Sequence, residues 1–148
     1  MSDEPLSLAL RALGQKERTV AEMGSWLRAR GVGDQESAEV IDHLVSTGVL
    51  DDARYARQYA EDKRSLKRWG SERIRSALLD RGIDPDDAEE ALAGGFEEEL
   101  DRAAELLAEQ GGNLDDALER QRALGVLQRR GYDSEVAYEA IRRVRHGD

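Results

Sequence analysis

The chain is organised around residues 48–83, which read GVLDDARYARQYAEDKRSLKRWGSERIRSALLDRGI. This segment predicts two helices with a tight break between them at Trp69-Gly70. Asp51 stands where the N-cap of the first helix is expected, because its carboxylate can accept a hydrogen bond from a free N–H of the first turn. The remaining helices are predicted below, before and after this pair.

The first of these helices has an apolar side. Tyr55, Tyr59 and Leu66 recur at helical spacing, and Ala56 and Ala60 lie beside them. Such a side is typical of a helix that packs against a core. We therefore expect the two tyrosines to face inward.

A different side of the same helix carries arginines at spacings of three, seven and four residues. Further basic side chains gather around Trp69 and continue into the second helix. Arginine and lysine at this density bind phosphates or complement an acidic protein surface. The alternative is that they form a solvated face and that Trp69 packs beneath the turn. The predicted partner-binding residues are Arg54, Arg57, Lys63, Arg64, Lys67, Arg68, Trp69, Arg73 and Arg75.

Charge is distributed unevenly along the chain, whose net charge is −10. Residues 84–119 hold 14 acidic side chains and one basic side chain, which gives −13 for this segment and +3 for the rest. Residues 53–82 hold nine Lys or Arg against four Asp or Glu, and the stretch from Arg120 holds seven against four. The acidic segment is either an ordinary solvated surface or a region that repels DNA or contacts a basic protein face.

Capping residues and glycines mark the other helices. The segment Thr19-Val20-Ala21-Glu22 is a capping box, so a helix is expected from Val20 to Ala29. Further helices are expected over residues 5–17 and 96–110, and after the N-cap residues Asp34, Asp84, Asp115 and Asp133.

An internal repeat is indicated by three glycines that end helices. Gly31, Gly82 and Gly131 are separated by 51 and 49 residues, and each follows a similar turn sequence. A three-helix unit of about 50 residues is too small to be comfortably stable alone, so neighbouring units should pack together. The predicted fold class is all-α, with three tandem three-helix repeats in an elongated or curved array, over residues 1–50, 51–95 and 96–148.

The central segment resembles the signature repeat of the RecX regulatory proteins. The resemblance lies in L-D-D-A-R-Y-A from Leu50 to Ala56, in the basic run that follows, in Gly70 and in the closing Gly82-Ile83. It implies tandem three-helix repeats and a protein that binds RecA–single-stranded-DNA filaments and modulates them, mostly by inhibition. It also implies that contact with single-stranded DNA is indirect or weak.

Composition excludes several classes of protein. The 148 residues include no cysteine, so no disulfide and no thiolate metal site is expected. No apolar run reaches the roughly 18 to 20 residues that a membrane span needs, and the acidic N-terminus is unlike a signal peptide. We expect a monomeric cytoplasmic protein that does not enter a membrane.

Residues that could carry out catalysis are few. His43 and His146 are the only histidines, and they lack metal-ligand spacing. The paired aspartates occupy helix starts, where capping accounts for them, and no phosphate-binding glycine loop is present. We therefore expect no enzymatic activity, no metal and no cofactor.

Two alternatives from other classes stay open at this point. One is a direct DNA-binding protein of helix-turn-helix type that uses the second helix of the central segment to read a duplex. The other is a helical-repeat scaffold for a protein unrelated to recombination.

Overall fold

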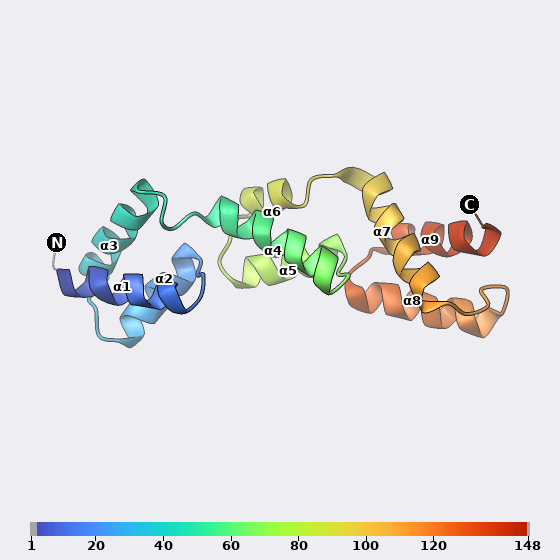
Figure 1. Cartoon of the computed structure of the whole chain (residues 1–148), viewed down its shortest axis with the longest axis horizontal. Coiled ribbons are helices and arrows are strands. Elements are labelled where there is room, and N and C mark those ends of the chain that lie inside the picture. The colour runs from blue at the N-terminus through green and yellow to red at the C-terminus, as the bar shows by residue number, and fades with distance from the viewer. Residues whose placement is uncertain (1–2, 148) are drawn as a thin grey trace. The chain divides into compact units, whose positions relative to one another are not determined.

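The computed structural model of the protein describes residues 3–147, and helices form nearly all of it (Figure 1). Those residues contain nine helices and no strand. The all-α fold class is therefore confirmed. The helices are α1 (Asp3–Gln15), α2 (Val20–Ala29), α3 (Asp34–Ser46), α4 (Asp52–Leu66), α5 (Ser71–Asp80), α6 (Pro85–Ala91), α7 (Gly95–Gln110), α8 (Ala117–Arg130) and α9 (Ser134–His146).

Contacts group the chain into two compact units. The first consists of Met1–Gln58 and Leu78–Ala91, and the second consists of Tyr59–Ala77 and Leu92–Asp148. Helix α4 therefore contributes to both units. This division follows contacts and not the sequence repeat, so the predicted repeat boundaries stay a prediction.

Each unit has its own apolar core. In the first unit, α1, α2 and α3 bring together a cluster that includes Ala9, Met23, Leu27, Val40 and Leu44. In the second unit, α7, α8 and α9 bring together a cluster that includes Leu100, Leu107, Leu127, Tyr132 and Ala140. Burial of apolar area at about 25 cal/mol per Å² is the main stabilising contribution in clusters of this kind.

The predicted apolar side of α4 is confirmed in its middle and wrong at its end. Ala56 and Ala60 are buried, and Tyr55 and Tyr59 are half-buried. Leu66, however, is 76% exposed. It is the last residue of α4, so it lies beyond the part of the helix whose apolar side is covered.

The helix starts follow capping chemistry, with two corrections. The Thr19–Glu22 capping box is formed in full, and Asp133 accepts a hydrogen bond from the backbone N–H of Val136 at 2.9 Å, as predicted. The predicted caps Asp34 and Asp115 are wrong. Asp34 lies inside the first turn of α3, behind an N-cap at Gly33, and α8 is capped by Asp116, whose carboxylate accepts from Leu118 N–H.

The three repeat glycines make the same turn. Gly31, Gly82 and Gly131 have φ of 80°, 82° and 98°, a left-handed conformation that glycine adopts without a steric penalty. In each case the residue after the glycine donates its N–H to the carbonyl of a fully buried leucine five residues back in the chain. These leucines are Leu27, Leu78 and Leu127.

Within residues 3–147, no helix is both long enough and apolar enough to cross a bilayer.

Candidate functional site

A junction between helices recurs in the two units. We define the first junction, in the first unit, as the start of α2 packed on the turn after α5. Thr19 Oγ1 donates to the carbonyl of Arg81 at 2.7 Å, and the backbone N–H of Val20 donates to Asp52 Oδ1 at 2.9 Å. A Cβ on Gly82 would overlap the Cβ of Ala21. The approach of the two backbones therefore requires glycine at position 82.

The second junction, in the second unit, repeats these contacts at the start of α5 and the turn after α8. The backbone N–H of Gly70 donates to the carbonyl of Arg130 at 2.7 Å, and the N–H of Ser71 donates to Glu99 Oε2 at 2.8 Å. A Cβ on Gly131 would overlap the Cβ of Arg73. In both junctions, therefore, an N–H at the start of a helix donates to a carboxylate that comes from a helix later in the chain.

Trp69 lies at the second junction between two cations. Lys63 Nζ is 4.8 Å from the centroid of its ring, and Arg73 Cζ is 4.1 Å from it. Tyr59 meets the same indole edge-on, with ring centroids 6.5 Å apart. Cation–π contacts of this kind stabilise the positive charges without neutralising them. Trp69 is half-buried, so it both packs at the turn and presents part of its surface.

Two arginines near Trp69, Arg73 and Arg130, bind backbone carbonyls and not carboxylates. Arg73 Nη1 donates to the carbonyl of Arg129 at 3.0 Å, and Arg130 Nη1 donates to the carbonyl of Lys67 at 2.6 Å. A carbonyl dipole orients a guanidinium but leaves its full charge in place. The result is a positive surface, which we name the junction patch: Lys63, Lys67, Trp69, Arg73, Arg129 and Arg130.

Two of the predicted binding residues are instead engaged inside the second unit. Arg64 is half-buried, and its Nη2 donates to the carbonyl of Leu92 at 3.2 Å. Burial lowers the pKa of Arg64, and the charge of Arg102 lowers it further. The expectation that Arg64 belongs to a solvent-facing stripe is wrong, because a helix end from later in the chain covers it.

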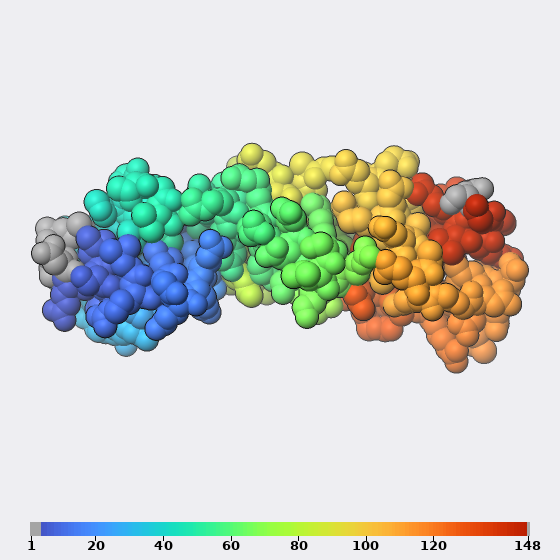
Figure 2. Space-filling model, in the orientation of Figure 1, coloured from blue at the N-terminus to red at the C-terminus, as the bar shows by residue number. Residues whose placement is uncertain are grey.

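Arg68 is held from several sides. Its guanidinium pairs with Glu105 at 3.6 Å and with Glu109, both on α7. Its backbone has a φ of 57°, uncommon for a residue with a side chain, and its carbonyl accepts a hydrogen bond from Tyr132 Oη at 3.1 Å. The expected outward display of Arg68 is therefore wrong as well. In the space-filling view, the green end of α4 abuts the orange surface of α7 (Figure 2).

The other predicted residues are distributed over both units. Arg54 is exposed but donates to the carbonyls of Gly48 and Val49 at 3.0 and 3.1 Å. Arg57 is exposed in the first unit, without a hydrogen bond or ion pair to any described residue. Arg75, in the second unit, is half-buried and has a partner within the protein.

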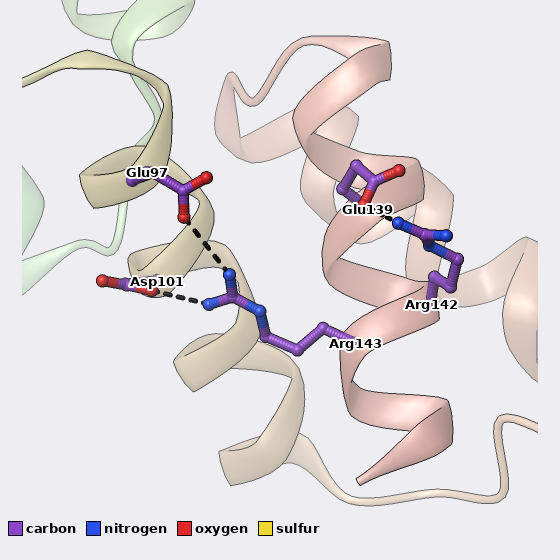
Figure 3. A network of polar contacts seen from close by, with 5 residues as sticks. All are labelled: Glu97, Asp101, Glu139, Arg142 and Arg143. Carbon is purple, nitrogen blue, oxygen red and sulfur yellow. Dashed lines mark hydrogen bonds and ion pairs between the residues drawn. The ribbon is translucent and has the colours of Figure 1, made fainter. Parts of the chain in front are cut away.

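Much of the acidic segment is neutralised within the second unit. Glu99 is buried and accepts a hydrogen bond from Arg102 at 3.2 Å in addition to the one from the start of α5. On the far side of α7, Arg143 of α9 reaches Asp101 at 2.6 Å and Glu97 at 3.5 Å (Figure 3). The hydrogen bond to Asp101 raises the pKa of Arg143. These pairs favour an intramolecular role for the α7 carboxylates.

Arg129 and Arg130 belong to the junction patch but were absent from the predicted set. They stand just before the third repeat glycine, and the fold brings them to Lys67 and Arg73. The available signal was the repeat itself, since aligning Gly131 with Gly82 places both arginines at a junction turn. A search for metal-binding groups of His, Cys, Asp and Glu gave none over the described residues.

Comparisons with known proteins agree on a family. A family profile described as "RecX, second three-helix domain" matches residues 51–92. The chain is 33% identical to the regulatory protein RecX of Mycobacterium avium (strain 104), with 94% of this chain and 83% of that protein covered. It is 31% identical to the regulatory protein RecX of Mycolicibacterium smegmatis (strain ATCC 700084 / mc(2)155), with 94% and 78% covered.

A solved structure supports the fold. The crystal structure of RecX from Lactobacillus salivarius matches with a TM-score of 0.84 at 22% identity, covering 96% of this chain and 95% of that one. The arrangement of three-helix groups defines a helical-repeat protein. On the strength of its sequence relatives, the chain belongs to the RecX family of regulatory proteins.

Proposed function

We propose that this protein binds RecA–single-stranded-DNA filaments and modulates them, mostly by inhibiting the ATPase and recombinase activities of RecA. Membership of the RecX family supports a regulatory role. We further propose that the protein acts in the cytoplasm as a monomer, without a cofactor and without catalysis of its own. Its place is then in recombination and DNA repair, including the SOS response.

The observation that carries this proposal is the junction patch. Carbonyls and the Trp69 ring orient Lys63, Arg73 and Arg130, while Lys67 and Arg129 are exposed, so the cations of the patch are free to attract an anionic partner. A filament of protein and DNA offers both acidic side chains and phosphates. Contact with single-stranded DNA is then part of binding to the filament, and the acidic charge elsewhere on the chain weakens binding to free DNA.

Direct reading of duplex DNA by α5 is opposed by the second junction. A reading helix of the helix-turn-helix type presents its first residues to the bases. Here the first turn of α5 is engaged by the turn after α8, since the N–H of Glu72 donates to the carbonyl of Gly131 at 3.0 Å. This covering favours the filament over a sequence-specific DNA site.

The proposal is tested by measuring RecA ATPase on single-stranded DNA while the protein is titrated in. The informative variant is Lys67→Glu with Arg129→Glu, because both side chains are exposed and neither has a hydrogen bond or ion pair to a described residue. We expect inhibition by the wild type and a concentration for half-inhibition about tenfold higher for the variant.

A matched control carries the same change in net charge in the first unit. Arg11→Glu with Lys16→Glu replaces two exposed basic side chains in and just after the last turns of α1. Like Lys67 and Arg129, neither side chain has a hydrogen bond or ion pair to a described residue. It should inhibit as the wild type does. Absence of inhibition by the wild type would refute the proposal, and equal potency of all three proteins would remove the junction patch from it. Circular dichroism checks that each variant is folded.

A further inference from the structure

An open groove lies beside the first junction, within the first unit. Its volume is about 540 Å³, and it runs between α2 and the end of α5. The groove is separate from the junction patch, which belongs to the second unit. The residues that line it include Arg18, Glu22, Trp26, Leu79, Asp80 and Arg81.

Trp26 lines this groove, and two guanidinium groups contact its ring. Arg30 Cζ lies 3.6 Å from the centroid of the Trp26 ring, and Arg18 Cζ lies 5.5 Å from it. Neither guanidinium has a hydrogen bond or ion pair to a described residue, and Arg18 Nε is buried without an acceptor. A buried donor without an acceptor is destabilising, and a ligand that accepts from it removes that cost. These two arginines are therefore held in place by an aromatic ring with their donors unused.

The groove also has an apolar side. Leu79, on α5, is 42% exposed there, and Ala21 and Gly82 form the close contact of the junction beside it. An exposed leucine next to a half-buried tryptophan suits an aliphatic side chain of a partner.

One of the two carboxylates in the groove, that of Glu22, already accepts a hydrogen bond within the protein. Glu22 Oε1 accepts the backbone N–H of Thr19 in the capping box at 3.0 Å. Asp80 stands at the other wall. The unused donors of Arg18, which lines the groove, are thus the feature that a ligand would complement, and Arg30 adds positive charge beside Trp26.

We propose that this groove binds an acidic peptide segment of a partner protein, with a carboxylate on Arg18 and an aliphatic side chain against Leu79 and Trp26. A carboxylate matches the planar fork of a guanidinium and gains a charge-assisted hydrogen bond there. This second docking surface goes beyond binding of the filament by the junction patch, and it does not depend on it.

Nucleic acid fits the same groove less well. The Trp26 ring is already covered by the Arg30 guanidinium at 3.6 Å, with that of Arg18 at 5.5 Å, so less of the ring is open for a base to stack on. Asp80 and Glu22 line the groove and repel a continuous run of phosphates. A single carboxylate beside an apolar side chain avoids both problems.

The test is fluorescence anisotropy with the full-length protein and a fluorescein-labelled peptide Gly-Ser-Leu-Glu-Leu-Ser-Gly, which carries one acidic side chain between two leucines. We expect saturable binding that is about tenfold weaker for the same peptide with Gln in place of Glu and for the variant Arg18→Met, which keeps the aliphatic stem. Leu79→Asp should weaken binding at least as much, because it removes an apolar contact and adds a repelling charge.

The variant Arg11→Met, which removes one exposed arginine of α1 outside the groove lining, serves as the matched control and should bind the peptide as the wild type does. No binding of the acidic peptide, equal affinity for the neutral one, or unchanged affinity in both groove variants would overturn the inference. So would efficient competition by a thymidine oligonucleotide, which would assign the groove to phosphates. RecA is absent from this assay, so its outcome is independent of the ATPase test.

Discussion

Gly131 illustrates how one missing side chain permits the second junction. Its φ of 98° disfavours any residue with a Cβ, and its neighbour Arg73 leaves no space for one. Gly31 has nearly the same conformation, with a φ of 80°, but a Cβ there would meet nothing within 4 Å. The two glycines therefore separate the conformational requirement from the packing requirement.

We predict that Gly131→Ala lowers the free energy of unfolding by about 3 kcal/mol or more, and that Gly31→Ala lowers it by about 1 kcal/mol. The smaller value is the cost of a left-handed alanine, and the difference is the clash with the backbone N of Arg73, 2.6 Å from the added Cβ. Urea unfolding followed by circular dichroism measures both. Equal losses would show that the junction yields to the extra methyl group.

At the scale of elements, the residues at which helices begin and end were more predictable than the residues that the helices contact. A glycine turn or a helix cap depends on residues within a few positions of one another, so the sequence predicts most of these helix ends to within a residue or two. The predictions for Asp34 and Asp115 were wrong by one residue, because α3 begins behind Gly33 without a side-chain cap and the adjacent Asp116 caps α8. The prediction that the arginines of α4 face solvent was wrong at Arg64 and Arg68 for a different reason. Their partners, Leu92 and α7, come from much later in the chain, and a local pattern does not reveal such contacts.

The carboxylate that closes the first junction makes stability depend on pH. Burial raises the pKa of Asp52 above its ordinary value of 3.8, although the hydrogen bond from Val20 N–H acts in the opposite direction. The folded protein therefore holds a proton on Asp52 more readily than the unfolded chain does. Its contribution to the free energy of unfolding is highest at low pH and falls as the pH rises from 3.8 through the raised pKa.

We predict that Asp52→Asn, which keeps an acceptor for Val20 N–H, removes this fall. Urea unfolding of both proteins between about pH 3.5 and 7 should show the wild type losing stability relative to the variant as the pH rises. A relative gain by the wild type over that range would mean that the charged form is favoured in the folded state, contrary to the effect of burial.

For the whole molecule, the predicted elongated array has a direct solution measurement. A compact protein of 148 residues has a radius of gyration of about 15 Å. We predict a clearly larger value by small-angle X-ray scattering, at the 16.5 kDa mass of a monomer by light scattering. A radius near 15 Å would contradict the array, and a doubled mass would contradict the monomer.

The junction patch, our proposed partner-binding surface, was predictable only in part. The sequence predicted that Lys63, Lys67, Trp69 and Arg73 lie together, because they follow one another around a single turn. Arg129 and Arg130 join them through a contact between segments about 60 residues apart, which neither helical periodicity nor local charge density encodes.

The carboxylate contributed by a later helix has a consequence for synthesis on the ribosome. When α2 leaves the exit tunnel, the acceptor for Val20 N–H has not yet emerged, because Asp52 lies 32 residues further along the chain. Ser71 likewise waits 28 residues for Glu99. Each nascent segment therefore stays incompletely closed until its successor emerges, which gives co-translational folding a fixed direction from the N-terminus onward.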